Sequence, residues 1–276
     1  MNQDDLHRAA ELLRGAEALL VCAGAGIGVD SGLPDFRGDE GFWRAYPPYR
    51  RLGLSFVELA DPVHFDADPE LAWGFYGHRL DLYRSTLPHA GFGVLRSWGA
   101  DLLGGVRVFT SNVDGQFQRA GFPADEVVEC HGSIHHLQCG VPCGPHVWPA
   151  DDVRLTVDAE TMRASSPLPT CPRCGAVARP NILMFGDGAW LGTRTEAVMS
   201  EYVRWRRELR RARLVVVEVG AGTAVPTVRR QAELASAADG ALVRVNPREA
   251  EVRHGRGVSL PGPALETLLA LDDLLG

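Results

Sequence analysis

Residues 16 to 38 read AEALLVCAGAGIGVDSGLPDFRG, an apolar run followed by a turn rich in glycine. The run 18–23 predicts a buried strand, and Gly24, Gly26 and Gly28 predict a tight turn into a helix start. Backbone N–H groups of such a turn converge where a phosphate can bind, and glycines let the backbone approach a pyrophosphate closely. The stretch therefore favours a nucleotide site after the first strand, although an ordinary strand-to-helix turn has a similar composition.

The glycine turn differs from that of a dehydrogenase. Val29 stands where the third glycine or alanine of GxGxxG/A belongs, and no second strand ending in an acidic residue follows promptly. A simple hydride-transfer enzyme is therefore disfavoured. Asp35, Phe36 and Arg37 lie in the rigid turn that comes next, where an acid, a ring and a guanidinium could close over a ribose or a nicotinamide.

Further motifs are spread over almost the whole chain. They are TSNVDG at 110–115, ECHGS at 129–133, two cysteine pairs, RPN through FGD at 179–187, and VGAG at 219–222. Together with GAGIGVDSGLPDFRG, and in this order, they resemble the sirtuins, the NAD-dependent protein deacylases, of the bacterial type. The resemblance implies NAD as co-substrate, with cofactor contacts at Gly24, Ala25, Gly26, Asp35, Phe36 and Arg37.

Composition narrows the class of protein. The 276 residues are 45% hydrophobic and suit one large domain or a large and a small one. A formal charge of −7, without a basic run, gives no electrostatic case for a nucleic-acid or membrane surface. The N-terminus lacks the pattern of a signal peptide, and no stretch approaches the length of a membrane span, so we expect a cytoplasmic protein.

The chain contains no lysine. A deacylase of this sequence cannot be its own acyl-lysine substrate, except through its α-amino group.

The predicted elements alternate between helices and strands. Apolar residues with a 3.6-residue period predict a helix over 4–14, and another is expected at 263–275. Strands are predicted at 18–23, 106–110, 127–129, 182–185, 214–219 and 242–245. Most are continuous apolar runs, as in parallel strands covered on both faces. The fold class is therefore α/β, a doubly wound parallel Rossmann-like sheet.

Two insertions should build a smaller domain. Residues 41–87 include a predicted helix at 69–85 and form a helical insertion, and residues 132–177 hold the paired cysteines. The remaining segments, 1–40, 88–131 and 178–276, form the NAD-binding domain. The two domains would face each other across a cleft at the carboxyl ends of the strands, where we expect the active site.

The four paired cysteines predict a structural zinc site. Cys139-x3-Cys143 and Cys171-x2-Cys174 supply four soft ligands, which suit tetrahedral zinc with no open position. The sirtuins usually have CxxC in both pairs, so the extra residue widens the first turn, and His146 is an alternative ligand. The other interpretation is four free thiols.

His131 follows the predicted strand 127–129 and can enter the cleft. A single histidine is more often a core residue whose hydrogen bonds are all made within the protein. The HGS context, however, resembles the sirtuins' catalytic histidine, which acts as general base on a ribose hydroxyl, and an imidazole suits that role.

Asn112 and Asp114 follow the predicted strand 106–110. The resemblance implies that they contact the ribose and the nicotinamide carboxamide, with Ser111 beside them, although Asn-x-Asp-Gly is also a turn sequence. Ser111 replaces the sirtuins' usual glutamine, and Phe117 replaces a histidine.

Two later segments complete the implied cofactor site. Gly220, Ala221 and Gly222 correspond to the sirtuins' Gly-Thr-Ser at the NAD phosphate, without its two hydroxyls. Asn246 matches an asparagine near the adenosine ribose, but it also fits a strand-ending turn with Pro247.

The resemblance also implies substrate contacts. Phe185 and Gly186 resemble the Phe-Gly-Glu segment that pairs with an extended substrate peptide. Tyr76 and Arg79 share one face of the predicted helix 69–85, and the simplest interpretation is that both are exposed to solvent on the helix surface. WGFYGHR nevertheless resembles the Tyr-x-x-Arg of sirtuins that prefer acidic acyl groups, in which the guanidinium binds a distal carboxylate.

The resemblance therefore implies an NAD-dependent lysine deacylase acting on acylated protein or peptide, a deacetylase or an enzyme for succinyl or malonyl groups. The alternatives are an ADP-ribosyltransferase or NAD glycohydrolase with the same site, and a non-enzymatic NAD or ADP-ribose sensor. Residues of the cofactor loops that differ from the sirtuin pattern, such as Gly28, are the reason to consider a sensor. The retained His131 and Asp114 argue against it.

Overall fold

The strand that precedes the glycine turn lies at the centre of a parallel sheet. We describe the protein from a computed structural model, in which residues 2–34, 38–209, 212–237 and 240–276 are described. The sheet consists, in spatial order, of β3 (Val127–Glu129), β2 (Val106–Thr110), β1 (Ala18–Ala23), β7 (Leu214–Val219), β8 (Ala241–Val245) and β9 (Gly257–Leu260). All neighbouring strands pair in parallel. The connectivity reverses direction between β1 and β7, the place where sheets of this order bind dinucleotides.

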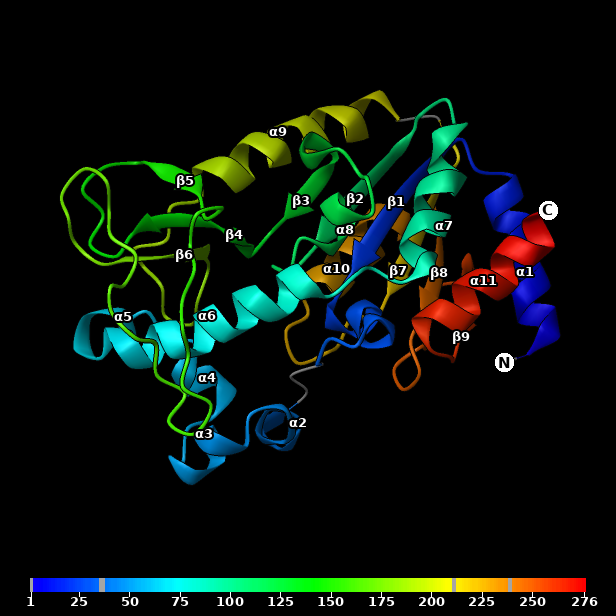
Figure 1. The fold of residues 1–276 in the computed structure, drawn as a ribbon. Coiled ribbons are helices and arrows are strands. Elements are labelled where there is room, and N and C mark those ends of the chain that lie inside the picture. The colour runs from blue at the N-terminus through cyan, green and yellow to red at the C-terminus, as the bar shows by residue number, and fades with distance from the viewer. Residues whose placement is uncertain (1, 35–37, 210–211, 238–239) are drawn as a thin grey trace.

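Helices cover both faces of this sheet (Figure 1). One face carries α1 (Gln3–Arg14), α7 (Ala90–Ala100) and α11 (Ala264–Leu275), and the other α9 (Thr193–Glu208) and α10 (Thr227–Ala237). β1 is buried along its whole length, as a central strand between two helical layers must be. The predicted doubly wound α/β class is confirmed.

The two insertions share a second apolar core. The helical insertion contains α2 (Gly38–Ala45), α3 (Pro47–Arg51), α4 (Phe56–Leu59), α5 (His64–Ala67) and α6 (Pro69–Ser85). An antiparallel sheet of order β5-β4-β6 packs with them and consists of β5 (Val147–Pro149), β4 (Gly132–Cys139) and β6 (Ala178–Ile182). Phe42 and Trp73 from the helices and Ile134 from β4 are fully buried in this core. In Figure 1 these elements lie on the left, beside the large sheet.

Short helical segments complete the described chain. They are two 3-10 helices, η1 (Ala25–Ser31) and η2 (Ala124–Glu126), and α8 (Gln116–Arg119). η1 begins directly after Gly24 and contains Gly26 and Gly28, so the glycine-rich segment itself is a 3-10 helix.

The predicted strands differ from the structure near Ile182 and at the C-terminal edge of the large sheet. The predicted strand 182–185 is wrong, because β6 ends at Ile182 and Phe185 N–H donates instead to the Ala60 carbonyl. β6 pairs with β4 in the small sheet, and the expected start of the large domain at 178 stays a prediction. The edge strand β9 was not predicted from its short Gly-Val-Ser-Leu run. The other domain boundaries stay predictions.

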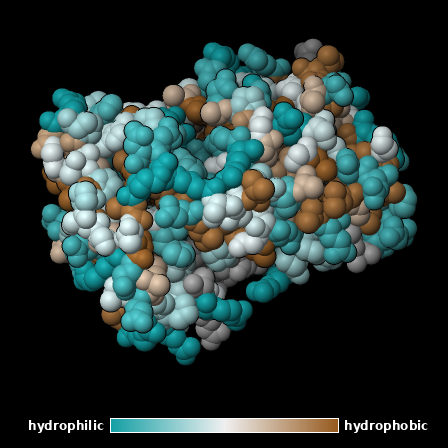
Figure 2. All heavy atoms as spheres, viewed as in Figure 1, coloured by the Kyte–Doolittle hydropathy of each residue, from teal (hydrophilic) through white to brown (hydrophobic). Residues whose placement is uncertain are grey.

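No helix in the described ranges combines the length and the apolar character that a membrane crossing needs. On the face in Figure 2, hydrophilic and hydrophobic residues are intermixed over both parts of the molecule.

Candidate active site

A cavity of about 730 Å³ opens where the strands of the large sheet end. Both parts of the molecule line it. From the large sheet come Gly24, Ala25, Ser111, Asn112, Asp114, His131, Gly220, Ala221, Gly222, Thr223, Arg248 and Glu249. From the other side come Phe56, Ala60, Tyr76, Arg79, Tyr83, Ile182, Leu183, Met184 and Phe185. Residues predicted from separate motifs are therefore brought together in one space.

Two glycines allow the loops after β1 and β7 to touch. A Cβ on Gly24 would lie 2.7 Å from the Ala221 Cα atom, and one on Gly220 would lie 2.4 Å from the Ile27 nitrogen. Gly220 also has a φ of +65°, which favours glycine. Gly26 does not line the cavity, and its N–H donates to the Gly220 carbonyl at 3.1 Å. The glycine turn thus packs against a second loop at the point where the strand order reverses.

The loop after β2 is fixed to the glycine turn by Asn112. Its side-chain nitrogen donates to the Gly24 carbonyl at 3.1 Å, and its backbone N–H donates to the Thr110 hydroxyl at 3.0 Å. Asp114 accepts from the Gln116 N–H at 2.9 Å. Burial raises the pKa of the Asp114 carboxyl to about 6. The cavity therefore holds a carboxylate at neutral pH that protonates in mild acid.

His131 lies between the large and the small sheet, two residues after β3 and one before β4. Burial lowers the pKa of its imidazole below the ordinary value, so the ring is neutral at pH 7 and can accept a proton. The His131 carbonyl accepts from the Leu183 N–H at 2.9 Å. Gly132 has a φ of +78°, and a Cβ there would lie 2.0 Å from the Asn181 carbonyl oxygen. The backbone on either side of the imidazole is therefore held closely.

A buried ion pair anchors the strand that leads to His131. The Glu129 carboxylate is 2.5 Å from the Arg194 guanidinium, and the Glu129 carbonyl accepts from the Thr195 hydroxyl at 3.0 Å. Arg194 and Thr195 lie in the first turn of α9, far from His131 in sequence. No sequence signal linked them to the site.

Arg79 and Tyr76 both line the cavity from α6. The Arg79 Nε and Nη2 atoms donate to the Tyr83 hydroxyl at 3.0 and 2.7 Å. Its guanidinium also lies over the Phe75 ring, 5.1 Å from the centroid. Burial raises the pKa of Tyr76 to about 12, so its hydroxyl stays protonated and able to donate. Tyr83 was missed from the sequence, although it stands one helical turn after Arg79.

Two predicted contact residues take other places. Asn246 does not line the cavity; its side chain donates to the Ala221 carbonyl at 2.9 Å and accepts from two backbone N–H groups of the loop after β8. Gly186 is also absent from the lining, while Phe185 is 40% exposed at its edge. Asp187 forms a buried ion pair with Arg179 at 2.8 Å, which fixes this turn. Asp35, Phe36 and Arg37 lie outside the described residues.

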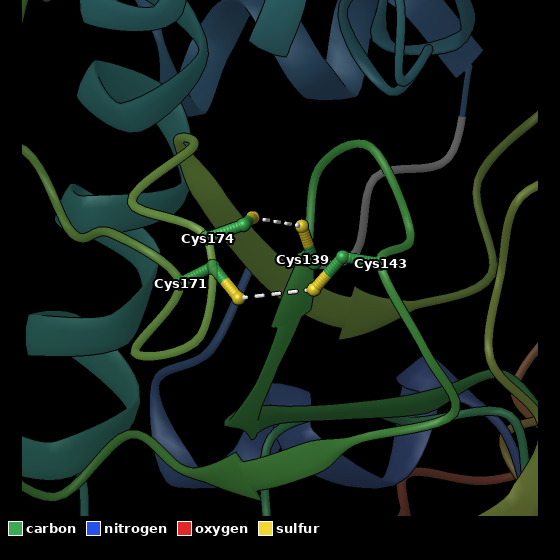
Figure 3. A group of neighbouring side chains, drawn as sticks. All are labelled: Cys139, Cys143, Cys171 and Cys174. Carbon is green, nitrogen blue, oxygen red and sulfur yellow. Dashed lines mark hydrogen bonds between the residues drawn. The ribbon is translucent and has the colours of Figure 1, made fainter.

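The four predicted metal ligands converge in the small domain (Figure 3). The sulfur of Cys139 is 3.6 Å from that of Cys174, and the sulfur of Cys143 is 3.7 Å from that of Cys171. Four sulfurs bound to tetrahedral zinc at about 2.3 Å lie about 3.8 Å apart, so the spacing fits the metal. Backbone N–H groups, first that of Arg173, lower the pKa of the Cys171 thiol to about 7, whereas its hydrogen bond with Cys171 raises the pKa of the Cys143 thiol and burial raises that of Cys139.

The alternative ligand does not join this cluster. Within the described ranges, the group of metal-ligating atoms contains the four cysteines and not His146. The His146 ring instead stacks on Trp148 with centroids 5.2 Å apart. The widened first cysteine pair therefore still brings all four sulfurs together.

Comparison with known proteins gives one consistent family. The model of the Sir2 family matches residues 24–223. NAD-dependent protein deacylase 1 of Pseudomonas aeruginosa is 31% identical over 259 residues, 94% of each chain. NAD-dependent protein deacylase 2 of Pyrobaculum aerophilum is 33% identical, over 94% of this chain and 91% of its own.

Solved structures agree with this. A Sir2 homologue in complex with NAD superposes with a TM-score of 0.74 at 25% identity, over 98% of this chain and 93% of its own. A Sir2 homologue in complex with ADP-ribose superposes with a TM-score of 0.71 at 27% identity, over 100% of this chain and 96% of its own. The chain belongs to the Sir2 family, the sirtuins.

Proposed function

We propose that this chain is an NAD-dependent protein lysine deacylase whose products are nicotinamide, acyl-ADP-ribose and free lysine. The observation that carries the proposal is the convergence of His131, Asn112 and Asp114 in a cavity at the reversal point of the sheet. The names of the relatives support it, as does a Sir2 homologue, 26% identical with a TM-score of 0.73, solved with 2′-O-acetyl-ADP-ribose.

NAD fits the loops that line this cavity. The backbone of Gly24 and Ala25 and the loop 220–222 meet without intervening side chains, so their amides can approach a pyrophosphate. Asp114 faces the same space with a carboxylate that can accept hydrogen bonds from the nicotinamide amide. Ser111 adds a hydroxyl. Asp35, Phe36, Arg37 and Asn246 remain predicted NAD contacts.

The reaction needs positioning and one proton acceptor from the protein. The acyl carbonyl oxygen forms a bond to C1′ of the nicotinamide ribose as the C–N bond to nicotinamide breaks. The neutral His131 imidazole then takes the proton of a ribose hydroxyl, whose oxygen bonds to the acyl carbon. The bond from that carbon to the lysine nitrogen breaks, the nitrogen leaves protonated as free lysine, and addition of one water molecule gives acyl-ADP-ribose. Asn112, held against Gly24, orients the ribose.

Product analysis tests this function. Incubation with NAD and a panel of acylated peptides, followed by mass spectrometry, should give nicotinamide, acyl-ADP-ribose and deacylated peptide in equal amounts. Free ADP-ribose with the peptide unchanged would indicate an NAD glycohydrolase, and ADP-ribose attached to a protein would indicate a transferase. A sensor would bind NAD and turn over none of it.

The substrate is proposed to be an acylated lysine of a protein or peptide, with no role for nucleic acid or membrane. Phe185 and Gly186 are proposed to contact the peptide backbone. We also propose a cytoplasmic location, where reducing conditions keep the zinc thiolates intact.

The acyl pocket is proposed to favour acidic acyl groups. Arg79 and Tyr76 line the cavity on the side opposite the cofactor loops, and both carry donors that suit a carboxylate. The ring of Phe75 and the hydroxyl of Tyr83 hold the guanidinium in place.

Replacing Arg79 by methionine should therefore remove a preference for succinyl-lysine. A charged hydrogen bond contributes roughly 1.5 to 3 kcal/mol, and about 1.36 kcal/mol corresponds to tenfold in rate, so the wild type should favour succinyl over acetyl peptide by about one to two decades in kcat/KM. Asp81→Asn, which changes an exposed charge on the same helix, should keep the preference. Equal rates on both peptides in the wild type, unchanged in Arg79→Met, would refute an acidic acyl pocket.

NAD affinity should fall as pH is lowered through about 6, the pKa of Asp114. The raised pKa means that the carboxylate is lost between pH 7 and 5 and not below pH 4. If only the carboxylate form accepts the nicotinamide amide, binding at pH 5 should be about tenfold weaker than at pH 7. Calorimetry of Asp114→Asn should show no such step.

ADP-ribose is the matched control ligand, because it lacks nicotinamide. Its affinity should vary little over the same pH range. An identical pH dependence of the affinities for NAD and ADP-ribose would show that Asp114 does not bind the nicotinamide amide.

A further inference from the structure

Two loops on the cofactor side of the cavity are tied together by an arginine behind them. The loops follow β7 and β8 and include Ala221 and Glu249. Arg229, in the first turn of α10, does not line the cavity. Its Nη2 atom donates to the Ala221 carbonyl at 3.2 Å and to the Glu249 carbonyl at 2.6 Å. One guanidinium therefore joins the two loops through their backbones.

A buried charge network of Glu218 and Arg244 contacts Arg229 on the side away from the two loops. Its side chain is 13% exposed and lies 3.8 Å from the carboxylate of Glu218, which is fully buried on β7. Glu218 also receives two hydrogen bonds of 2.8 Å from Arg244, its neighbour on β8. The Arg229 guanidinium is therefore placed between the Glu218 carboxyl group on one side and the carbonyls of the two loops on the other.

The Ala221 carbonyl receives a second donor. The Asn246 side chain reaches it at 2.9 Å, so two side chains from different elements hold the same oxygen. The two loops are further joined by the Thr223 hydroxyl, which donates to the Glu249 carboxylate at 2.6 Å. The orientation of the peptide that joins Ala221 to Gly222 is therefore set from the side away from the cavity.

This orientation matters because a trans peptide is planar. The N–H of Gly222 belongs to the same plane as the Ala221 carbonyl and points in the opposite direction. Since Arg229 and Asn246, which do not line the cavity, donate to the carbonyl, the N–H points away from these two side chains, and Gly222 itself lines the cavity. Neither Ala221 nor Gly222 has a hydroxyl, so backbone N–H groups are the donors that these two residues offer.

We propose that Arg229 is a positioning residue for the cofactor: by holding the Ala221 carbonyl, it aims the Gly222 N–H at an anionic group of the dinucleotide, a phosphate of NAD or ADP-ribose. This inference rests on the proposed NAD-dependent function. Arg229, although it lies outside the cavity lining, would keep the loop 220–222 able to bind a phosphate without hydroxyl side chains at Ala221 and Gly222.

The test compares Arg229→Gln with Arg230→Gln, an exposed arginine next to it on the same helix. Calorimetry should show that Arg229→Gln binds ADP-ribose about tenfold more weakly than the wild type. The KM for NAD should rise by a similar factor while kcat and the KM for acyl peptide change by less than about twofold, the pattern of lost uniform binding. Arg230→Gln should match the wild type in every constant.

The outcomes are distinguishable. Wild-type protein that binds neither NAD nor ADP-ribose would overturn both the proposed function and this inference. Wild-type affinity in a folded Arg229→Gln variant would overturn the inference alone. If Arg229→Gln does not fold, Arg229→Lys keeps the charge beside Glu218 but ends one bond short of the carbonyls. It should bind ADP-ribose more weakly than the wild type, and unchanged affinity would again overturn the inference.

Discussion

Replacing His131 by alanine should lower kcat/KM for deacylation by about 1,000-fold, because a positioned general base contributes roughly 10²- to 10⁴-fold. Burial keeps the wild-type imidazole neutral, so it is ready to accept the proton of a ribose hydroxyl at pH 7. The variant should still bind NAD within about threefold of the wild-type affinity, because proton transfer is not needed for binding. Steady-state kinetics and calorimetry on the same preparation measure both quantities.

His7→Ala is the matched control, because His7 is exposed on α1 and does not line the cavity. It should retain wild-type kinetics. A His131→Ala variant that has lost NAD affinity in proportion to its activity would contradict the role of base and make His131 an anchoring residue. Full activity in that variant would remove it from the chemistry altogether.

Removing zinc should unfold the small domain. Structural zinc sites contribute about 10 to 16 kcal/mol in small zinc-binding peptides, which is as large as the whole stability of a typical domain, about 5 to 15 kcal/mol. The purified protein should contain one zinc per chain by elemental analysis. Cys171→Ser should lose the metal and activity together, and circular dichroism should show partial loss of structure.

Cys130→Ser serves as the control, since Cys130 lies outside the cluster of four sulfurs. Its zinc content should equal that of the wild type, whatever its activity. A metal-free preparation with four titratable thiols and unchanged structure would refute a structural role for zinc.

The central part of the fold was predictable because its strands are continuous apolar runs. The expected bounds 18–23, 106–110, 127–129 and 214–219 agree with the structure, and so does the helix 69–85. The run 182–185 is as apolar as these, yet it does not extend the sheet. There the Met184 amide donates to the carboxylate of nearby Asp187, and the Phe185 amide donates to the Ala60 carbonyl of the helical insertion, a distant partner that no local pattern reveals.

The site was predictable to the extent that single motifs carry it. His131, Asp114 and Arg79 each lie in a short segment with its own signature, and parallel strands deliver the first two to one edge. Arg229 and Thr195 have no such signature, because their hydrogen bonds are made to backbone carbonyls of other elements. Contacts of this kind depend on tertiary packing and are invisible in a one-dimensional pattern.

β4 joins two sites that differ in chemistry. It begins at Gly132, directly after His131, and ends at Cys139, one of the four sulfur ligands. At about 3.3 Å per residue, the Cα atoms of His131 and Cys139 are up to about 26 Å apart. An oxidant that attacks the thiolates would therefore displace a strand whose other end adjoins His131, the proposed general base. Inactivation by such reagents would not require any of them to enter the cavity, and a bound dinucleotide would give no direct protection.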